Sequence, residues 1–260
     1  MPEYQFNDII KEGLRLSARR TQPSTQKTDA WNSKPLLRYF DQYWVTYDPM
    51  STRRKVLVPE RVFRYIEWRE SEGVGVAGIR RELAVASKCI RSCAKYLYWQ
   101  LPNPFENPPL EQSKPRKRQG TDAEIGALLE HARQPLRDMI LWYLNTWMRP
   151  SEGRLLQWHE VQGDRVVLDQ QKNGSDMPLA LSAAALAILE RQPKVGPFVF
   201  TGENGEPLTK DGLAWLQRLA RREASKVTPT VATLQLRDLR RTGATRALAQ
   251  PGVTTEDIRA

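Results

Sequence analysis

The chain has 260 residues, two cysteines and a formal net charge of +10, which suits one large or two ordinary domains with a basic surface. No stretch approaches 18 consecutive apolar residues, and the start lacks a charged segment followed by an apolar one, so neither a membrane span nor a secretory signal is expected. The basic excess favours a polyanionic partner, although an ordinary solvated basic surface would give the same composition.

The N-terminal region, residues 1–113, is expected to be all-helical. Residues 20–35 are polar and predict a loop. Apolar residues at helical spacing then predict helices over 59–72 and 78–99. The second of these helices carries several basic side chains beside its apolar stripe, which indicates either a solvated face or a face toward phosphate groups.

The two cysteines, Cys89 and Cys93, lie four residues apart in the second helical pattern. This spacing fits two free thiols in a core better than a disulfide. It favours a reducing, cytoplasmic setting for the protein.

A boundary follows. Residues 102–120 hold five of the eighteen prolines and show no periodic apolar pattern, which predicts an extended linker. Within it, residues 114–120 carry four basic residues and no acid. This basic linker is expected to separate the N-terminal region from a C-terminal region of residues 121–260.

The C-terminal region mixes helices with short strands. Thr121 and Glu124 predict a capping box, while Ser151 and Ser182 are expected to cap two later helices. Two strands, 165–171 and 176–182, are expected to join around an Asn-Gly turn, and 198–200 predicts a short buried strand. Helices are predicted over 125–132, 135–147, 151–158, 182–192, 209–226 and 233–250.

Several chemistries find no support in the sequence. Neither GxxxxGK[ST], GxGxxG nor GxSxG occurs, and the two histidines, His131 and His159, have no cysteine or histidine at metal-binding spacing. A zinc site, a nucleotide-driven motor and a serine hydrolase are therefore not expected. No metal and no cofactor is predicted.

Three basic elements remain: the arginine of TWMRPSEGRLLQWHEV, Lys172 beside the predicted hairpin turn, and LRDLRRTGATRAL, where Arg237 and Arg240 share a helix face. Each alone is ordinary, since arginines near helix ends usually serve as surface charges. In this order they resemble the boxes of tyrosine recombinases, the phage integrases, commonly written TG-x-R-x-x-E-x-x-x-L-x-W and H-x-L-R-R-T. The family's core-binding domain is also resembled, by IRRELAVASKCIRSCAKYLYWQLPNPF, so the resemblance spans roughly residues 1–260.

The resemblance implies a mainly α fold with a small antiparallel β-sheet. It would comprise a helical, SAM-like core-binding domain over 1–113 and an α+β catalytic domain over 121–260, joined by the linker 114–120. The implied partners are duplex DNA at an attachment site and other recombinase protomers, with no membrane and no nucleotide cofactor. The implied DNA contacts are Arg80, Arg81, Lys114, Arg116, Lys117 and Arg118.

The resemblance also implies a reaction. Recombinases of this family cut a DNA strand through a 3′-phosphotyrosine, without metal or ATP. Arg149 and Arg240 would then clamp the oxygens of the reacting phosphate, and Lys172 would act as general acid for the leaving 5′ oxygen. Glu152 would support Arg149, unless it is simply an acid favoured in the first turn of a helix.

Two features depart from the family pattern. Arg237 stands where the family has a histidine, and an arginine donates to phosphate but accepts no proton. It either takes part in the site or faces DNA as a plain charge. In addition, all eight tyrosines lie at or before Tyr143, so no nucleophile follows the boxes. We therefore expect a catalytic domain that is C-terminally incomplete, by a designed end or a shortened gene, and a chain that binds DNA without cleaving it.

Two other readings of the sequence remain open at this point. The chain could be a non-catalytic DNA-binding protein of recombinase descent, which a gene ending naturally at residue 260 would favour. It could also be an unrelated basic helical protein that binds RNA. Preference for single-stranded RNA over duplex DNA would favour that reading.

Overall fold

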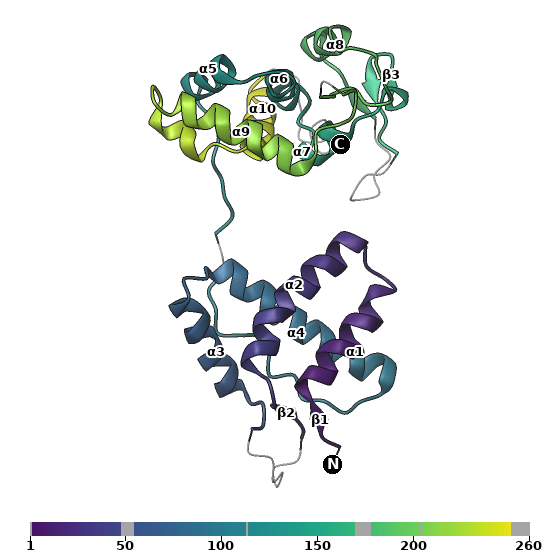
Figure 1. The fold of residues 1–260 in the computed structure, drawn as a ribbon, viewed down its shortest axis with the longest axis vertical. Coiled ribbons are helices and arrows are strands. Elements are labelled where there is room, and N and C mark those ends of the chain that lie inside the picture. Colours follow the sequence, from purple (N-terminus) through teal and green to yellow (C-terminus); the bar gives the residue numbers. More distant parts are fainter. Residues whose placement is uncertain (1, 48–54, 113, 170–177, 203, 251–260) are drawn as a thin grey trace. The chain divides into compact units, whose positions relative to one another are not determined.

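Two separate cores organise the computed structural model of this chain, which describes residues 2–47, 55–112, 114–169, 178–202 and 204–250. The chain divides into two units, Met1–Pro115 and Arg116–Ala260, and each unit is described by itself (Figure 1). None of the helices in the described ranges is long and apolar enough to cross a membrane.

The N-terminal unit is helical, with one pair of two-residue strands. Strands β1 and β2 pair antiparallel, with Tyr4 opposite Val45. The elements in chain order are β1 (Tyr4–Gln5), α1 (Phe6–Ala18), α2 (Pro23–Tyr39), β2 (Trp44–Val45), α3 (Pro59–Ser71) and α4 (Val76–Leu97).

Helix α4 is the centre of this unit, and α1, α2 and α3 all pack against it. The approach of α1 is close: a Cβ added at Gly13 would lie 2.3 Å from the Cβ of Cys89. Cys89 and Cys93 are both buried free thiols, as predicted, and burial raises the pKa of each. An aromatic cluster of Phe6, Phe40 and Tyr65 completes the core beside them.

A buried acid also ties α3 to α4. Glu82 accepts hydrogen bonds from the Tyr65 hydroxyl at 2.6 Å and from the Arg69 guanidinium at 2.6 and 2.9 Å. A buried carboxylate is tolerable only when it is paired in this way. The contact fixes the two helices against each other at a polar point of an otherwise apolar interface.

The prediction of a loop over 20–35 is wrong, because helix α2 begins at Pro23 and runs to Tyr39. Of its seventeen residues only Ser33 and Leu36 are buried, so the apolar periodicity that marks a helix is absent. Contacts with α4 hold it instead, including an ion pair of 2.7 Å between Asp29 and Lys88. Pro23 at the first helical position was the available start signal.

The C-terminal unit combines a group of packed helices with a small antiparallel sheet, whose strand order is β3-β4-β5. Val166 of β4 lies opposite Val161 of β3 and Leu179 of β5. The elements are α5 (Asp122–His131), α6 (Leu136–Thr146), α7 (Pro150–Leu155), the 3₁₀ helix η1 (Trp158–Glu160), β3 (Val161–Gln162), β4 (Arg165–Val166), β5 (Leu179–Ala180), α8 (Ala183–Glu190), α9 (Lys210–Ala224), the 3₁₀ helix η2 (Pro229–Thr233) and α10 (Leu236–Leu248).

The prediction of a mainly helical chain with a small antiparallel sheet is confirmed. The caps at Thr121 and Ser182 are present, since their hydroxyls accept from the backbone N–H groups of Glu124 and Ala185. The Ser151 cap is wrong: Pro150 opens α7, so the cap position falls on Arg149. Residues 198–200 form no strand, although Val199 donates to the carbonyl of Leu156 at 2.8 Å.

Helix α10 packs against α6 at the centre of the C-terminal unit (Figure 1). The crossing is close at Gly243, where an added Cβ would lie 2.1 Å from the carbonyl oxygen of Leu144. Since that oxygen belongs to the backbone, it cannot move aside as a flexible side chain would. Gly243 therefore sets the distance between these two helices.

We expect Gly243→Ala to lower the free energy of unfolding by about 1 to 3 kcal/mol, because the methyl group forces α10 away from α6. Urea denaturation followed by circular dichroism measures this change. Gly126→Ala is the matched control: Gly126 also lies in a helix, and a Cβ there meets nothing within 4 Å. That variant should be neutral or slightly more stable. Equal losses in both variants would contradict the role given to Gly243.

Candidate functional site

Arg149 is presented at the junction of two helices. Helix α6 ends at Thr146. Trp147 follows with a left-handed backbone of φ 56°, and Pro150 then starts α7. The Glu152 carboxylate accepts from the backbone N–H of Arg149 at 2.7 Å and from its guanidinium at 2.6 Å. One acid thus caps α7 and orients the Arg149 side chain, of which 33 % remains exposed.

Arg240, from α10, reaches the same place. It lines one small pocket together with Arg149 and Glu152, and the pocket volume of about 20 Å³ admits one water-sized group, such as a phosphoryl oxygen. Burial, and next the positive charge of Arg149, lower the pKa of Arg240. Since arginine stays protonated in proteins, the described residues that line the pocket bring two cations and one carboxylate, that of Glu152.

The sheet supplies another wall of this pocket. Val166, Leu168 and Leu179 line it, and these residues come from β4, β5 and the chain directly after β4. Apolar walls reduce the water around the two guanidinium groups and so strengthen their attraction for an anion. Lys172, the predicted general acid, lies outside the described residues.

Arg237 does not enter the pocket. Its side chain is exposed and lines a neighbouring groove with Pro150, Lys210 and Arg221. Of the four predicted catalytic residues, the structure therefore brings Arg149 and Arg240 together and places Arg237 beside them.

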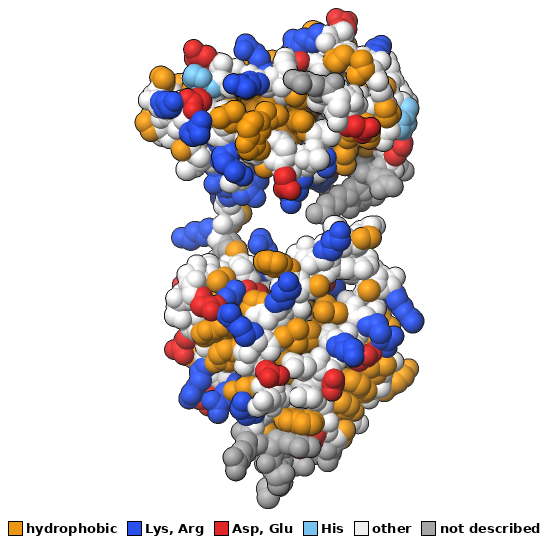
Figure 2. All heavy atoms as spheres, in the orientation of Figure 1, with side chains coloured by type: hydrophobic (Ala, Val, Ile, Leu, Met, Phe, Trp, Pro, Cys, Tyr) orange, Lys and Arg blue, Asp and Glu red, His pale blue; other side chains and the backbone are white. Residues whose placement is uncertain are grey.

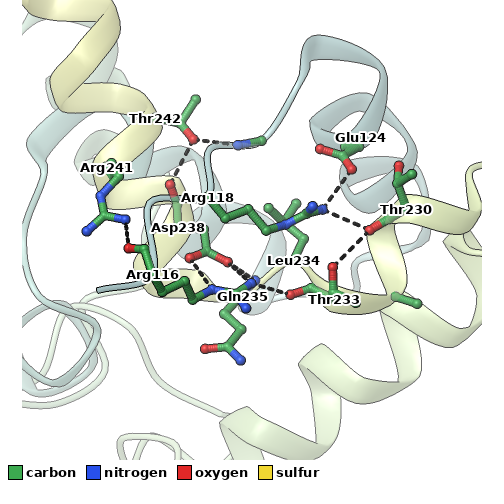
Figure 3. Close-up of polar contacts among 12 residues, drawn as sticks. Arg116, Arg118, Glu124, Thr230, Thr233, Leu234, Gln235, Asp238, Arg241 and Thr242 are labelled. Atoms are coloured by element: carbon green, nitrogen blue, oxygen red, sulfur yellow. Dashed lines mark hydrogen bonds and ion pairs between the residues drawn. The ribbon is translucent and has the colours of Figure 1, made fainter. Parts of the chain in front are cut away.

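Arg116 of the predicted basic linker is bound within the C-terminal unit rather than free (Figure 3). Its guanidinium donates to both carboxylate oxygens of Asp238, at 2.9 and 2.7 Å, and to the carbonyl of Thr233 at 2.7 Å. The Asp238 side chain is 1 % exposed and also accepts from the backbone N–H of Gln235, which caps the start of α10. Arg116 is thereby tied to the helix that carries Arg240.

Arg118 is anchored in the same way (Figure 3). It donates to the Glu124 carboxylate at 2.7 Å and to the carbonyl of Thr230 at 2.8 Å. Two residues later, the backbone N–H of Gly120 donates to the Thr242 hydroxyl at 2.8 Å. The segment from Arg116 to Gly120 is therefore bound along α10, η2 and the start of α5.

The remaining predicted DNA contacts fall into two groups. Arg80 donates to the carbonyls of Leu110 and Glu111 within its own unit, the second of these at 2.9 Å. Arg81, Lys114 and Lys117 are exposed, and within the described ranges no ion pair holds them. Three of the six predicted contacts are thus bound by the protein itself: Arg80, Arg116 and Arg118.

Sequence reasoning missed Asp238, Glu124 as the partner of Arg118, and the conformation of Trp147. Asp238 carried a usable signal, because an acid three residues into a helix often accepts from the backbone N–H at the cap. For metal ions, the described part of the chain gathers no group of three His, Cys, Asp or Glu side chains.

We expect Asp238→Asn to lower the free energy of unfolding by about 2 kcal/mol at neutral pH, because it weakens charged hydrogen bonds in a buried place. Burial favours the neutral acid, but hydrogen bonds from Arg116 and the backbone of Gln235 outweigh it and lower the pKa of Asp238 below 3.8. The ionised group therefore contributes stability above pH 3.8 that is lost as the pH falls through the lower folded value.

Urea denaturation of both proteins at a series of pH values tests this expectation. The difference in the free energy of unfolding between the native chain and Asp238→Asn should become smaller as the pH falls below the ordinary range of carboxyl pKa values. Asp164→Asn, at an exposed acid, should show no comparable difference. If the two free energies of unfolding differed by the same amount at every pH, the charge of Asp238 would not be the cause of the lost stability.

Trp147 offers a second test, because its left-handed backbone costs any residue with a Cβ about 1 kcal/mol or more relative to glycine. Trp147→Gly and Trp147→Ala both remove the indole, and they differ in this strain. We expect the glycine variant to unfold at higher urea concentration than the alanine variant. The reverse order would mean that the left-handed conformation is not retained in solution.

Comparisons with known proteins give the same fold. A lambda integrase tetramer bound to a Holliday junction superposes with a TM-score of 0.73 and 14% identity, covering 98% of this chain and 76% of that one. The Tn1549 transposon integrase in complex with transposon right end DNA gives 0.72 and 15%, covering 98% and 90%. A lambda integrase dimer bound to a COC′ core site gives 0.71 and 15%, covering 94% and 90%. No curated protein matches.

The sequence profile of the phage integrase family matches residues 120–260, which is more than half of the chain. The matched segment contains both arginine boxes, the pocket they form and the helix α10 that Asp238 caps. The chain therefore belongs to the phage integrase family of tyrosine recombinases.

Proposed function

We propose that this protein takes part in site-specific DNA recombination, and that the pocket of Arg149 and Arg240 binds the reacting phosphate of a DNA strand. The observation that carries the proposal is the meeting of these two arginines, which lie far apart along the chain, in one small and partly desolvated pocket. Guanidinium groups match phosphate oxygens in bidentate geometry, and their attraction is strongest where water is scarce.

The reaction of this family suggests a chemical role for each basic residue of the site. A tyrosine hydroxyl gives up its proton and its oxygen forms a bond to phosphorus, while the bond from phosphorus to the 5′ oxygen breaks and the 5′ oxygen takes up a proton. Arg149 and Arg240 would stabilise the negative charge on the non-bridging oxygens during this exchange. Lys172 would supply the proton. Arg237 would contribute charge only, since it accepts no proton.

The nucleophile is not among the residues after Tyr143, because no tyrosine occurs there. Tyr143 itself is fully buried, and its hydroxyl donates to the carbonyl of Pro150 at 3.0 Å. Burial raises the pKa of Tyr143, so its phenol loses a proton less readily than that of an exposed tyrosine. Although Tyr143 is near Arg149 in the sequence, its role is structural, and the 260-residue polypeptide should bind DNA without cutting it.

The proposed partners are duplex DNA and further recombinase protomers. Two of the similar solved structures are lambda integrases bound to DNA, one as a dimer on a core site and one as a tetramer on a Holliday junction. Exposed basic residues of both units would contact the backbone, with Arg81, Lys114 and Lys117 available for this purpose. Contacts of this kind position a protein on DNA without reading its sequence.

Binding to duplex DNA is the first test. Fluorescence anisotropy with labelled duplexes selected from a random pool should show affinity that falls steeply with salt, because each phosphate contact releases counterions. Arg149→Ala combined with Arg240→Ala should weaken binding and reduce the salt slope by about 2. Lys226→Gln, at an exposed lysine paired with Glu223, is the matched control and should leave the slope unchanged.

Tighter binding to single-stranded RNA than to duplex DNA would overturn the proposed function. A covalent complex would overturn the narrower claim about cleavage. We expect no adduct that survives denaturing gel electrophoresis when the 260-residue polypeptide is incubated with nicked duplexes. Were one to form, peptide mapping would identify the attacking residue.

A further inference from the structure

A basic groove adjoins the arginine pocket, and of the residues that line it only Arg237 has been given a part in the reaction so far. Its volume is about 330 Å³, and three cationic side chains line it: Lys210 and Arg221 of α9, and Arg237 of α10. Leu213 and Leu236 form part of its apolar lining. Among the described residues that line this groove, none has an acidic side chain.

The cations of this groove are free to take an anion. Neither Lys210 nor Arg237 has an ion-pair partner in the described ranges. Arg221 donates to the carbonyls of Ala232 and Leu234 at 3.2 and 3.3 Å, while its buried Nε has no hydrogen-bond acceptor. Burial, and then the charges of Arg218 and Arg116, lower the pKa of Arg221.

Like charges gathered without an acid are unfavourable in the free protein. Asp238 is the acid that directly follows Arg237, but its carboxylate is already bound by Arg116 and the backbone of Gln235. In Figure 2, Lys and Arg side chains gather along the lower edge of the C-terminal unit, on the side where α7 and α9 lie in Figure 1. An anionic ligand would relieve this repulsion.

The groove and the pocket are neighbours. Pro150 lines the groove and directly follows Arg149, which lines the pocket. Arg237 and Arg240 stand three residues apart on α10, so they share a helix face with about 5–6 Å between their Cβ atoms. Neighbouring phosphates of one DNA strand advance by about 3.4 Å along the duplex axis and also turn about it, so their separation in space is larger than this rise. Two cations one helical turn apart can therefore reach two phosphates that are one nucleotide step apart.

We propose that the groove of Lys210, Arg221 and Arg237 binds the phosphate next to the reacting one on the same DNA strand. This inference rests on the proposed function and adds a second anchoring point to it. Lys210 and Arg237 contact the neighbouring phosphate, and Arg221 adds positive potential from the groove wall. Two adjacent phosphates held at once fix the strand in register, so that the reacting phosphate faces Arg149 and Arg240.

Salt dependence tests the groove in solution. Lys210→Gln and Arg237→Gln should each reduce the slope of log affinity against log salt by about 1, and the double variant by about 2. Lys226→Gln again serves as the control, because Lys226 lies just beyond the same helix but outside the groove. Unchanged slopes in both groove variants, alongside normal duplex binding by the native chain, would overturn the inference and leave the proposed function standing.

Phosphate-ethylation interference on a selected duplex locates the contact. Lys210→Gln should lose sensitivity at a single phosphate, and Arg240→Ala should lose it at the adjacent phosphate of the same strand. Loss at phosphates on opposite strands would overturn the inference. If the complex has no fixed register, the salt slopes alone decide. Absence of any duplex binding by the native chain would instead overturn the proposed function.

Discussion

The C-terminal unit depends on one buried carboxylate. Asp238 accepts from the Arg116 guanidinium through both oxygens and from the backbone N–H of Gln235, so it begins helix α10 and ties the incoming chain to it. Arg240 stands two residues later, and its position at the pocket follows from where α10 starts. A buried acid is costly unless it is fully paired, and here that pairing fixes the geometry of a cationic site.

The helices with an apolar stripe could be predicted from sequence, because burial imposes a period on α4 and on most helices of the C-terminal unit. The polar helix α2 could not, since only Ser33 and Leu36 face a core. The ordered boxes predicted that Arg149 and Arg240 act together. They could not show that Arg116 is bound by Asp238, because these partners lie 122 residues apart in the sequence. Nor could they show that Arg118 is bound by Glu124, because the chain between them is not one helix and no regular spacing predicts the contact.

The cations of the C-terminal unit differ in whether an acidic side chain lies beside them. Arg149 shares Glu152 with the start of α7, whereas Lys210 and Arg237 face a groove in which no described residue is acidic. The protein therefore holds some cations close together at a cost in electrostatic repulsion. Stability and function are opposed at such a place, because an added acid would relieve the repulsion and also exclude a phosphate.

The internal pairing of the segment from Arg116 to Gly120 has a consequence for how substitutions in this protein are interpreted. Each carboxylate that holds an arginine also hides it from solvent anions, so losing that acid unmasks a cation while it loosens the fold. A variant without that acid would then be retained more strongly on a polyanionic resin, although it unfolds at a lower temperature. In screens that measure nucleic-acid affinity alone, a substitution that removes one of these acids would therefore be mistaken for an improved binder.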